Sequence, residues 1–459
     1  MIAKPLDIPR VSFYTVGCRL NQAETSLLQD GFRKKGFIPV AYGQETDLLV
    51  VNSCTVTEGA ESDCRRVVRQ VLRHSPQAFV AVTGCFAQTG LHALRQVEGI
   101  DLIVGNQFKM QLPDILPTES PLAKQSIPLV QHGRIDPENF LLDGVGEYTT
   151  TRANLKIQDG CQFMCAFCLI PFARGRERSR VREDAVREAE ALVARGHREL
   201  VLTGVNIGQY EDRGRDLLGL IRDLEAIEGL DRIRISSIEP TTIPDSLLDH
   251  MAISKKLCRH LHVPLQSGDD GILRAMNRRY TMKEYRRWME QAVEHIPGLC
   301  FGTDIMVGFP GEGIREFQHT YRVVEELPFA YVHVFSYSPR PGTASLRLPN
   351  AVSASVIKNR SRELHQLSAL KRQAFDQRFL GQEVSVLFES EEKWGYWTGL
   401  TDHYIRVSVR STRSLSNQWL PVVITGVMAD RVVGLLQHSA QYNPSQPVIS
   451  GTVPLVSIS

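Results

Sequence analysis

The sequence lacks long apolar runs and a strong net charge of either sign. Its apolar runs, such as Leu48–Val51, are only long enough for a strand, so we expect no membrane-spanning segment. The N-terminus lacks a basic stretch followed by an apolar one, which predicts a cytoplasmic rather than an exported protein. The formal net charge is +2. A surface that binds a polyanion must therefore be a local patch.

Nine cysteines stand in an otherwise ordinary composition of 42% hydrophobic and 23% charged residues. The length of 459 residues allows several domains. In a reducing compartment these cysteines indicate metal or redox chemistry rather than a disulfide framework. Cys64, Cys258 and Cys300 can equally be small buried apolar residues.

Cys161, Cys165 and Cys168 have the Cx3Cx2C spacing that lets three thiolates ligate one iron–sulfur cube. The fourth iron then has no protein ligand. S-adenosylmethionine (SAM) is the cofactor that coordinates such an iron and is cleaved into methionine and a 5′-deoxyadenosyl radical. A structural zinc site is the alternative. Zinc needs four ligands, and no further Cys or His lies within about ten residues, so the spacing favours the radical chemistry.

The N-terminal part predicts a doubly wound parallel α/β domain over residues 1–108. Cys18, Cys54 and Cys85 each lie at or just after a predicted strand end, and parallel strands bring these ends to one crevice. Packing is the usual role of such a cysteine, but three in equivalent positions favour a second cluster. The strands are expected at Val11–Gly17, Asp47–Asn52, Phe79–Gly84 and Asp101–Gly105, and the helices at Gln22–Lys35, Glu58–His74 and Thr89–Val97.

Residues 109–145 are rich in Pro, Gly and polar residues and are expected to form an interdomain linker. From 146 to 379, six strand–helix units predict a partial (β/α)6 barrel. Its strands are expected at Asn154–Gln158, Leu200–Thr203, Arg232–Ser237, His260–Leu265, Cys300–Val307 and Tyr331–Tyr337. Polar and glycine residues at the carboxyl ends predict a SAM cradle, with ordinary turns as the alternative. The candidates are Thr203, Gly204, Asn206, Ser237, Glu239, Pro264, Gln266, Ser267, Asp304 and Gly308.

After a basic helix from Ser353 to about Phe379, residues 380–440 predict a small five-stranded antiparallel β-barrel of the OB-like type. We expect Tyr404 and Arg406 in this barrel to bind RNA. We also expect Arg174, Arg178 and Arg180, beside the cysteine loop, to attract phosphates. A solvated strand face and local ion pairs are the alternatives. Residues 441–459 are expected to be a tail. The strands are expected at Val384–Phe388, Gly395–Leu400, Tyr404–Val409, Val422–Val427 and Arg431–Leu436.

These three parts, in this order, resemble the methylthiotransferases, a branch of the radical-SAM enzymes, over nearly the whole chain. The resemblance implies a C-terminal TRAM domain of the RNA-binding type. It also implies two [4Fe–4S] clusters, an auxiliary one and a SAM-binding one. It is carried by Thr15-Val16-Gly17-Cys18-Arg19-Leu20-Asn21 with Glu24, by Val51-Asn52-Ser53-Cys54-Thr55-Val56-Thr57, by Thr83-Gly84-Cys85, and by Cys161, Cys165 and Cys168.

Within that family, the segment Cys168-Leu169-Ile170-Pro171-Phe172-Ala173-Arg174-Gly175 is most similar to enzymes that act on N6-threonylcarbamoyladenosine at position 37 of tRNA. Sister groups act on N6-isopentenyladenosine in tRNA or on an aspartate of a ribosomal protein. The resemblance implies that one SAM methylates a sulfur on the auxiliary cluster and that a second yields the radical that activates adenine C2.

The expected partners are tRNA and an electron donor such as a flavodoxin or a ferredoxin. The sequence leaves the oligomeric state open. An iron–sulfur protein that binds RNA without turnover is the alternative from another class.

Overall fold

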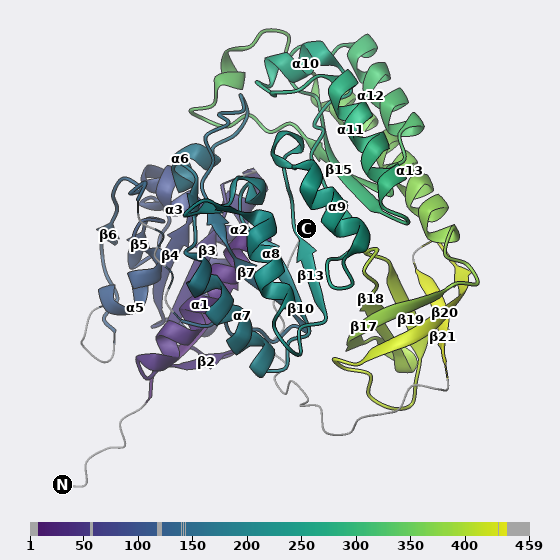
Figure 1. The fold of residues 1–459 in the computed structure, drawn as a ribbon. Coiled ribbons are helices and arrows are strands. Elements are labelled where there is room, and N and C mark those ends of the chain that lie inside the picture. Colours follow the sequence, from purple (N-terminus) through teal and green to yellow (C-terminus); the bar gives the residue numbers. More distant parts are fainter. Residues whose placement is uncertain are drawn as a thin grey trace, which may run out of the picture.

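The computed structural model describes residues 8–55, 58–116, 122–138, 140, 142, 144–429 and 431–437. Within these ranges, no helix is both long enough and apolar enough to cross a membrane. Figure 1 shows three units in chain order: a purple and blue α/β unit, a larger teal and green α/β unit, and a yellow β-barrel. The α/β class and the three-part order predicted from the sequence are confirmed.

A six-stranded parallel sheet forms the N-terminal unit, in the order β2-β1-β3-β4-β5-β6. Strand β3 is buried along its whole length because apolar clusters cover both faces of the sheet. Leu49 and Val51 enter one cluster while Leu48 and Val50 enter the other, as a period of two requires. The strands are β1 (Arg10–Thr15), β2 (Ile38–Val40), β3 (Leu48–Ser53), β4 (Phe79–Gly84), β5 (Leu102–Val104) and β6 (Leu129–Gln131). The helices are α1 (Arg19–Lys34), α2 (Glu58–His74), α3 (Cys85–Thr89), α4 (Leu91–Leu94), η1 (Lys109–Gln111) and α5 (Leu112–Ile115).

Two expectations for this unit are wrong. Residues 109–145 are not simply a linker, because η1 and α5 pack beside α1 and β6 adds an edge strand to the sheet. The unit therefore extends at least to residue 131. Strand β6 has only three residues, too few for a hydrophobic period to show. The helix expected over Thr89–Val97 is instead two short helices, α3 and α4, separated at Gly90, where a side chain would collide with the Phe86 ring.

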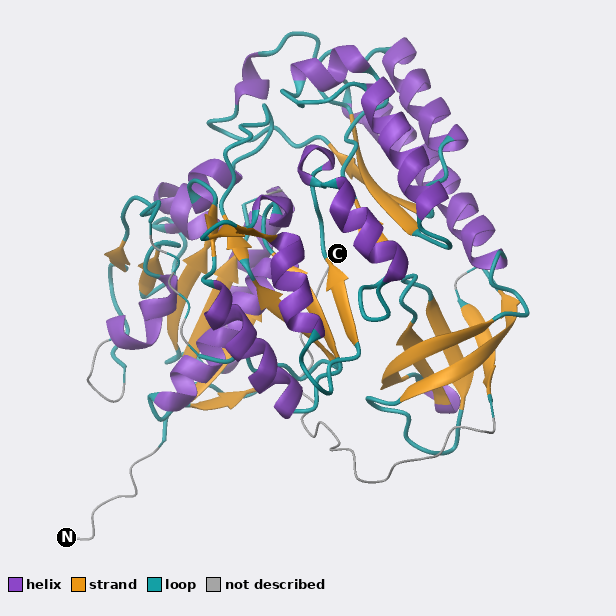
Figure 2. Cartoon of the chain, viewed as in Figure 1, coloured by secondary structure: helices purple, strands orange, loops and turns teal. Residues whose placement is uncertain are grey.

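Six parallel strands curve into an open barrel in the second unit (Figure 2). Two three-stranded sheets, β13-β10-β7 and β14-β15-β16, are joined by single bridges that pair Ile233 with Leu257 and Ser237 with His262. The predicted partial (β/α)6 barrel is confirmed. The strands are β7 (Arg152–Lys156), β10 (Glu199–Thr203), β13 (Arg232–Ile235), β14 (His260–His262), β15 (Cys300–Val307) and β16 (Tyr331–Ser336). The longer helices outside them are α7 (Arg182–Ala194), α8 (Leu217–Glu225), α9 (Asp245–Ile253), α11 (Met282–His295), α12 (Ile314–Glu326) and α13 (Ala354–Gln377).

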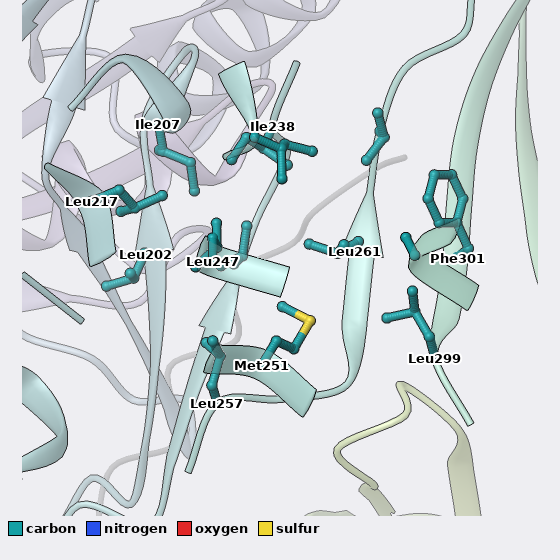
Figure 3. Close-up of a cluster of buried hydrophobic side chains, with 14 of the residues drawn as sticks. Leu202, Ile207, Leu217, Ile238, Leu247, Met251, Leu257, Leu261, Leu299 and Phe301 are labelled. Carbon is teal, nitrogen blue, oxygen red and sulfur yellow. The ribbon is translucent and has the colours of Figure 1, made fainter. Parts of the chain in front are cut away.

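The apolar core of this barrel lies between its strands and the outer helices. Figure 3 shows Leu202 of β10, Leu247 of α9 and Leu261 of β14 in one cluster. Because strand side chains alternate between the two faces, the intervening residues point into the barrel. On β7 these inward residues are Arg152, Asn154 and Lys156. The lumen of the barrel is therefore polar.

Five strands close the C-terminal barrel in the order β17-β18-β19-β21-β20, with one parallel pair, β19 with β21. Phe375 and Phe379, near the end of α13, share an apolar cluster with Tyr331 of the larger barrel. Arg232 donates to the carbonyl groups of Leu400 (2.7 Å) and Ser385 (2.6 Å), which docks the two barrels together. The expected tail at 441–459 lies outside the described residues. The strands are β17 (Glu383–Glu391), β18 (Tyr396–Leu400), β19 (Arg406–Arg410), β20 (Trp419–Val427) and β21 (Val432–Leu436).

Candidate active site

Cys161, Cys165 and Cys168 lie in the loop between β8 (Gln158–Asp159) and α6 (Ile170–Arg174), just beyond the carboxyl end of β7. All three are half-buried. Backbone N–H groups point at two of the sulfur atoms, from Phe163 to Cys161 Sγ (3.5 Å) and from Ile170 to Cys168 Sγ (3.4 Å). N–H donors of this kind stabilise iron-bound thiolates.

Arg278 fixes this loop to the strand ends, and sequence reasoning missed it. Its Nη1 lies 3.4 Å from Cys165 Sγ and 3.2 Å from Glu239 Oε1, and its Nη2 donates to Glu239 Oε2 and to the Pro264 carbonyl. The side chain is only 3% exposed. The one available signal was the adjacent pair Arg278–Arg279, which follows the expected Pro264–Gly268 loop by ten residues. Arg278 thus connects Cys165 with two residues of the predicted SAM cradle.

Cys18, Cys54 and Cys85 meet at the carboxyl edge of the N-terminal sheet. They follow β1, β3 and β4, which are neighbours in the sheet. Gly17 has φ +102°, and a Cβ there would come within 2.8 Å of Cys54 Sγ. The Asn106 amide lies 3.7 Å from Cys85 Sγ. Cys18 is exposed while the other two are buried, so the group opens to the outside on the Cys18 side.

The spacing of both trios fits a multinuclear cluster better than a single ion. Among the described residues, only His262, Asp304 and His333 form a group of three whose ligand atoms all lie within 4.8 Å of one another. A tetrahedral zinc ion needs its thiolates less than about 4 Å apart. Burial raises the pKa of Cys161 to about 11 and that of Cys168 to about 12. Iron binds thiolates, so an iron–sulfur cluster held by these sulfur atoms would displace the two protons.

Several residues predicted for the SAM cradle instead make hydrogen bonds or packing contacts within the protein. Thr203 Oγ1 donates to Val201 O (3.0 Å), and Ser267 is fully buried beside Thr320. Asn206 is also buried, where its amide bonds Gln209 and Thr242. Gly204 packs against Gln158, and Gly308 against Ile357. Packing and local hydrogen bonds within the protein account for these five residues.

The other candidates surround the lumen near the cysteine loop. Ser237, Glu239, Gln266 and Asp304 are half-buried, and Gln266 has the rare positive φ of 71°. The Pro264 carbonyl accepts from Tyr280 (3.0 Å) as well as from Arg278. Ser237, Gln266 and Asp304 therefore keep polar atoms available to a ligand in the lumen.

A chain of polar rings crosses the floor of the lumen, and sequence reasoning missed it as well. His262 Nε2 lies 2.9 Å from Asp304 Oδ1, and its Nδ1 lies 3.1 Å from the Tyr331 hydroxyl. That hydroxyl also bonds His260 Nε2 (2.9 Å). Burial favours the neutral form of Asp304, but His262 and His333 outweigh it and hold the pKa of Asp304 well below its usual range.

The three arginines expected to attract phosphates are buried in ion pairs, which corrects that expectation. Arg180 pairs with Asp184 (2.6 Å) and with Glu188. The Arg178 side chain is 9% exposed and lies 3.6 Å from Asp159. Arg174 is 1% exposed. A phosphate cannot reach these guanidinium groups without breaking buried ion pairs, so Arg174, Arg178 and Arg180 are not RNA-binding candidates.

Arg174 belongs to a buried ionic group centred on Glu24 of α1. Glu24 lies 2.7 Å from Lys109, 2.7 Å from Lys156 and 2.9 Å from Arg174. Arg174 also bonds Asn21 Oδ1 (2.6 Å) and Asp159 (3.0 Å). Since Lys156 and Asp159 belong to the barrel and Glu24 to the N-terminal unit, this group joins the two cysteine-bearing units.

The two residues expected to bind RNA in the small barrel differ in exposure. Arg406 is exposed on β19. Tyr404 is half-buried, and its ring stacks on His260 at 4.4 Å between centroids. Its hydroxyl accepts from Arg19 Nη2 (3.0 Å). The Tyr404 ring therefore faces the lumen and does not form an open surface on which bases stack. This corrects the expectation that Tyr404 binds RNA.

Comparison with known proteins follows the same division of the chain. The Radical SAM superfamily model matches residues 155–324, and the model of the uncharacterized protein family UPF0004 matches residues 10–105. The threonylcarbamoyladenosine tRNA methylthiotransferase MtaB of Bacillus subtilis (strain 168) is 34% identical over 90% of this chain and 93% of its own length. The chain belongs to the radical-SAM methylthiotransferases. The family uses SAM and two [4Fe–4S] clusters, and the two cysteine trios are the groups in this chain that fit them.

Other relatives have either the same name or the name of a sister group. The MtaB of Aquifex aeolicus (strain VF5) is 37% identical over 87% of this chain and 96% of its own. A tRNA-2-methylthio-N(6)-dimethylallyladenosine synthase of Cereibacter sphaeroides is 33% identical over 92% and 97%. Among solved structures, the radical SAM methyltransferase TsrM from Kitasatospora setae has a TM-score of 0.50 and 14% identity, covering 73% of this chain and 77% of its own. That likeness supports the fold only.

Proposed function

We propose that the protein adds a methylthio group to C2 of N6-threonylcarbamoyladenosine at position 37 of tRNA. The substrate is supported by the relatives named for this reaction, which match about nine-tenths of the chain. The observation that carries the proposal is the junction of the two cysteine trios. Helix α6 follows Cys168 and ends at Arg174, which bonds Asn21 and Glu24 on the helix that follows Cys18.

Cys161, Cys165 and Cys168 are proposed to hold the SAM-binding cluster, and Cys18, Cys54 and Cys85 the auxiliary cluster. When bound, the clusters and SAM supply an electron, a carbon-centred radical, sulfur and a methyl group. The side chains of the protein position the cluster loop and SAM and shield them from water. Arg278 orients Cys165 and favours its thiolate form. Ser237 and Gln266 offer hydrogen bonds to the polar ends of SAM, and the packing of Phe167 on Phe309 keeps water from the loop.

The tRNA is proposed to bind through exposed arginines on two surfaces. One is Arg406, with Arg410, on β19. The other is helix α2, where Arg65, Arg69 and Arg73 recur every four residues and are exposed. They line two hollows along α2, and in the described part of the chain no carboxylate forms a salt bridge with them. A helix rises about 6 Å over four residues, which spaces the three charges along one face.

Methylthiolation of dimethylallyladenosine in tRNA is the second candidate, supported by the Cereibacter sphaeroides relative. Mass spectrometry of nucleosides from cells that lack the protein distinguishes the two. The proposal expects loss of the methylthio derivative of threonylcarbamoyladenosine, restored by the wild-type gene and not by a Cys165→Ala gene. Loss of the dimethylallyl derivative alone would establish the second candidate instead.

A further inference from the structure

Arg19 is a half-buried cation in the lumen that has no carboxylate partner among the described residues. It follows Cys18 directly, at the start of α1. In the described part of the chain, its side chain donates to the neutral hydroxyl of Tyr404, at 3.0 Å. A guanidinium carries five N–H donors, so most of its hydrogen-bonding capacity is unused.

The other buried or half-buried cations around this part of the lumen each pair with an acid. Arg152 pairs with Glu389 (2.5 Å) and Arg234 with Glu199 (2.7 Å). Lys109, Lys156 and Arg174 share Glu24, and Arg278 pairs with Glu239. Among the described residues, an anionic ligand that enters the lumen beside Cys18 therefore meets one buried or half-buried cation that no carboxylate of the protein neutralises, Arg19.

Tyr404 is built to present its hydroxyl at this point. Its backbone has φ +60°, a conformation that residues other than glycine rarely adopt. The ring stacks on His260, at 4.4 Å between centroids, and the Arg234 guanidinium lies 5.3 Å from the ring centroid. Because the hydroxyl oxygen accepts from Arg19, its own proton is free to be donated to a second acceptor.

The electrostatics of the pair favour an anion. Burial acts to raise the pKa of Tyr404, but Arg19, Arg152 and Arg234 outweigh it and the pKa falls. This shift reports an excess of positive charge at this spot, which a bound carboxylate would relieve.

We propose that Arg19, assisted by the Tyr404 hydroxyl, binds the carboxylate of the threonylcarbamoyl group and is a specificity-determining residue of the enzyme. This inference rests on the proposed function. The threonylcarbamoyl group carries a carboxylate and a hydroxyl, whereas the dimethylallyl group is a hydrocarbon. A site built around a charged hydrogen bond rejects the analogue that cannot make it, because the buried donor is then left without a partner.

The test compares the reconstituted holoenzyme with its Arg19→Gln, Arg19→Lys and Tyr404→Phe variants. The substrates are two anticodon stem-loop RNAs, one with threonylcarbamoyladenosine and one with its carboxamide analogue, which lacks the charge. Arg19→Gln should lower kcat/KM about 100-fold for the acid and only a few-fold for the amide. Arg19→Lys should recover part of the loss because it keeps the charge, and Tyr404→Phe should cost the acid several-fold.

Arg33→Gln, on the exposed part of the same helix, is the matched control. It should leave kcat/KM unchanged for both the acid and the amide RNA. Iron per chain and RNA-independent formation of 5′-deoxyadenosine check that each variant retains its clusters. Equal losses for acid and amide would overturn the assignment of Arg19 while leaving the proposed function standing. A wild-type enzyme that modifies only a dimethylallyladenosine RNA would refute the proposed function, and the assignment with it.

Discussion

Neutralising Glu24 should weaken the junction between the N-terminal unit and the barrel more than any exposed ion pair can. The Glu24 side chain is 3% exposed and contacts Lys109, Lys156 and Arg174. With Asp159 and its second partner Arg178, the group holds two negative charges against four positive ones, a net charge of +2. Glu24→Gln changes this to +3 in a buried site.

Removing one partner of a buried ion pair costs about 3–5 kcal/mol, because the remaining charges stay desolvated. At a urea dependence of about 3 kcal/mol per molar, a loss of 3 kcal/mol lowers the unfolding midpoint by about 1 M. Burial already lowers the pKa of Lys109, and Glu24 opposes that shift. Without Glu24 the pKa of Lys109 falls further, so release of its proton should make the loss smaller at alkaline pH than at pH 7.

The assay is anaerobic urea unfolding of the holoprotein followed by circular dichroism at both pH values. Asp114→Asn is the control, since it removes the exposed pair with Lys35, whose side chains are 52% and 60% exposed. It should change stability by no more than about 1 kcal/mol. Equal midpoints for Glu24→Gln and Asp114→Asn would refute the reasoning.

Cys161→Ala, Cys165→Ala or Cys168→Ala should each abolish 5′-deoxyadenosine formation after anaerobic reconstitution; normal cleavage by all three would remove the SAM cluster from this loop. Replacing Cys18, Cys54 and Cys85 together by Ala should remove about half of the bound iron, and leave SAM cleavage intact while methylthiolation of tRNA stops. Full iron and normal product would make these cysteines packing residues. Burial opposes ionisation of Glu199, but Arg234 and Arg152 outweigh it and lower the pKa of Glu199 from 4.5 to about 2. The stabilisation by ionised Glu199 is therefore fully present above pH 4.5 and is lost as the pH falls toward 2. The difference in urea midpoint between wild type and Glu199→Gln should shrink below pH 4.5. A difference that does not depend on pH would contradict this linkage. Replacing Arg65, Arg69 and Arg73 by Gln should flatten the salt dependence of tRNA binding by about 2–3 units of log–log slope, measured by filter binding, while the same change at Arg287, Arg315 and Arg322 on α11 and α12 should not.

Elements with a strong hydrophobic pattern were predictable from the sequence. Strands Phe79–Gly84 and Cys300–Val307 and helix Glu58–His74 have the predicted bounds. In each case an apolar run or period is long enough to specify the element locally. Strand β6 was not predictable, because three partly exposed residues at a sheet edge take their conformation from the pairing with β5.

For the site, spacing predicted the cysteines but not the residues around them. A run of arginines beside Cys168 has the local pattern of a phosphate site. What decides its role is that Arg174 meets Glu24, 150 residues earlier in the chain, inside a buried group. Arg278 and the pairing of His262 with Asp304 likewise join segments that only the closed barrel brings together. The alternating strand pattern predicts an exposed Tyr404 ring, because such a pattern does not reveal which face a neighbouring unit covers.

We propose that both cysteine trios act together on one modified adenosine in tRNA. The most direct test of this proposal is a single-preparation reaction of the anaerobically reconstituted enzyme with SAM, a chemical reductant and two RNAs, one bearing threonylcarbamoyladenosine and the other dimethylallyladenosine, analysed by mass spectrometry of the nucleosides. We expect 5′-deoxyadenosine together with a methylthio product from the threonylcarbamoyl RNA only, and no such product when Cys18, Cys54 and Cys85 are replaced. A methylthio product from the dimethylallyl RNA alone, or an unchanged yield from the triple variant, would contradict it.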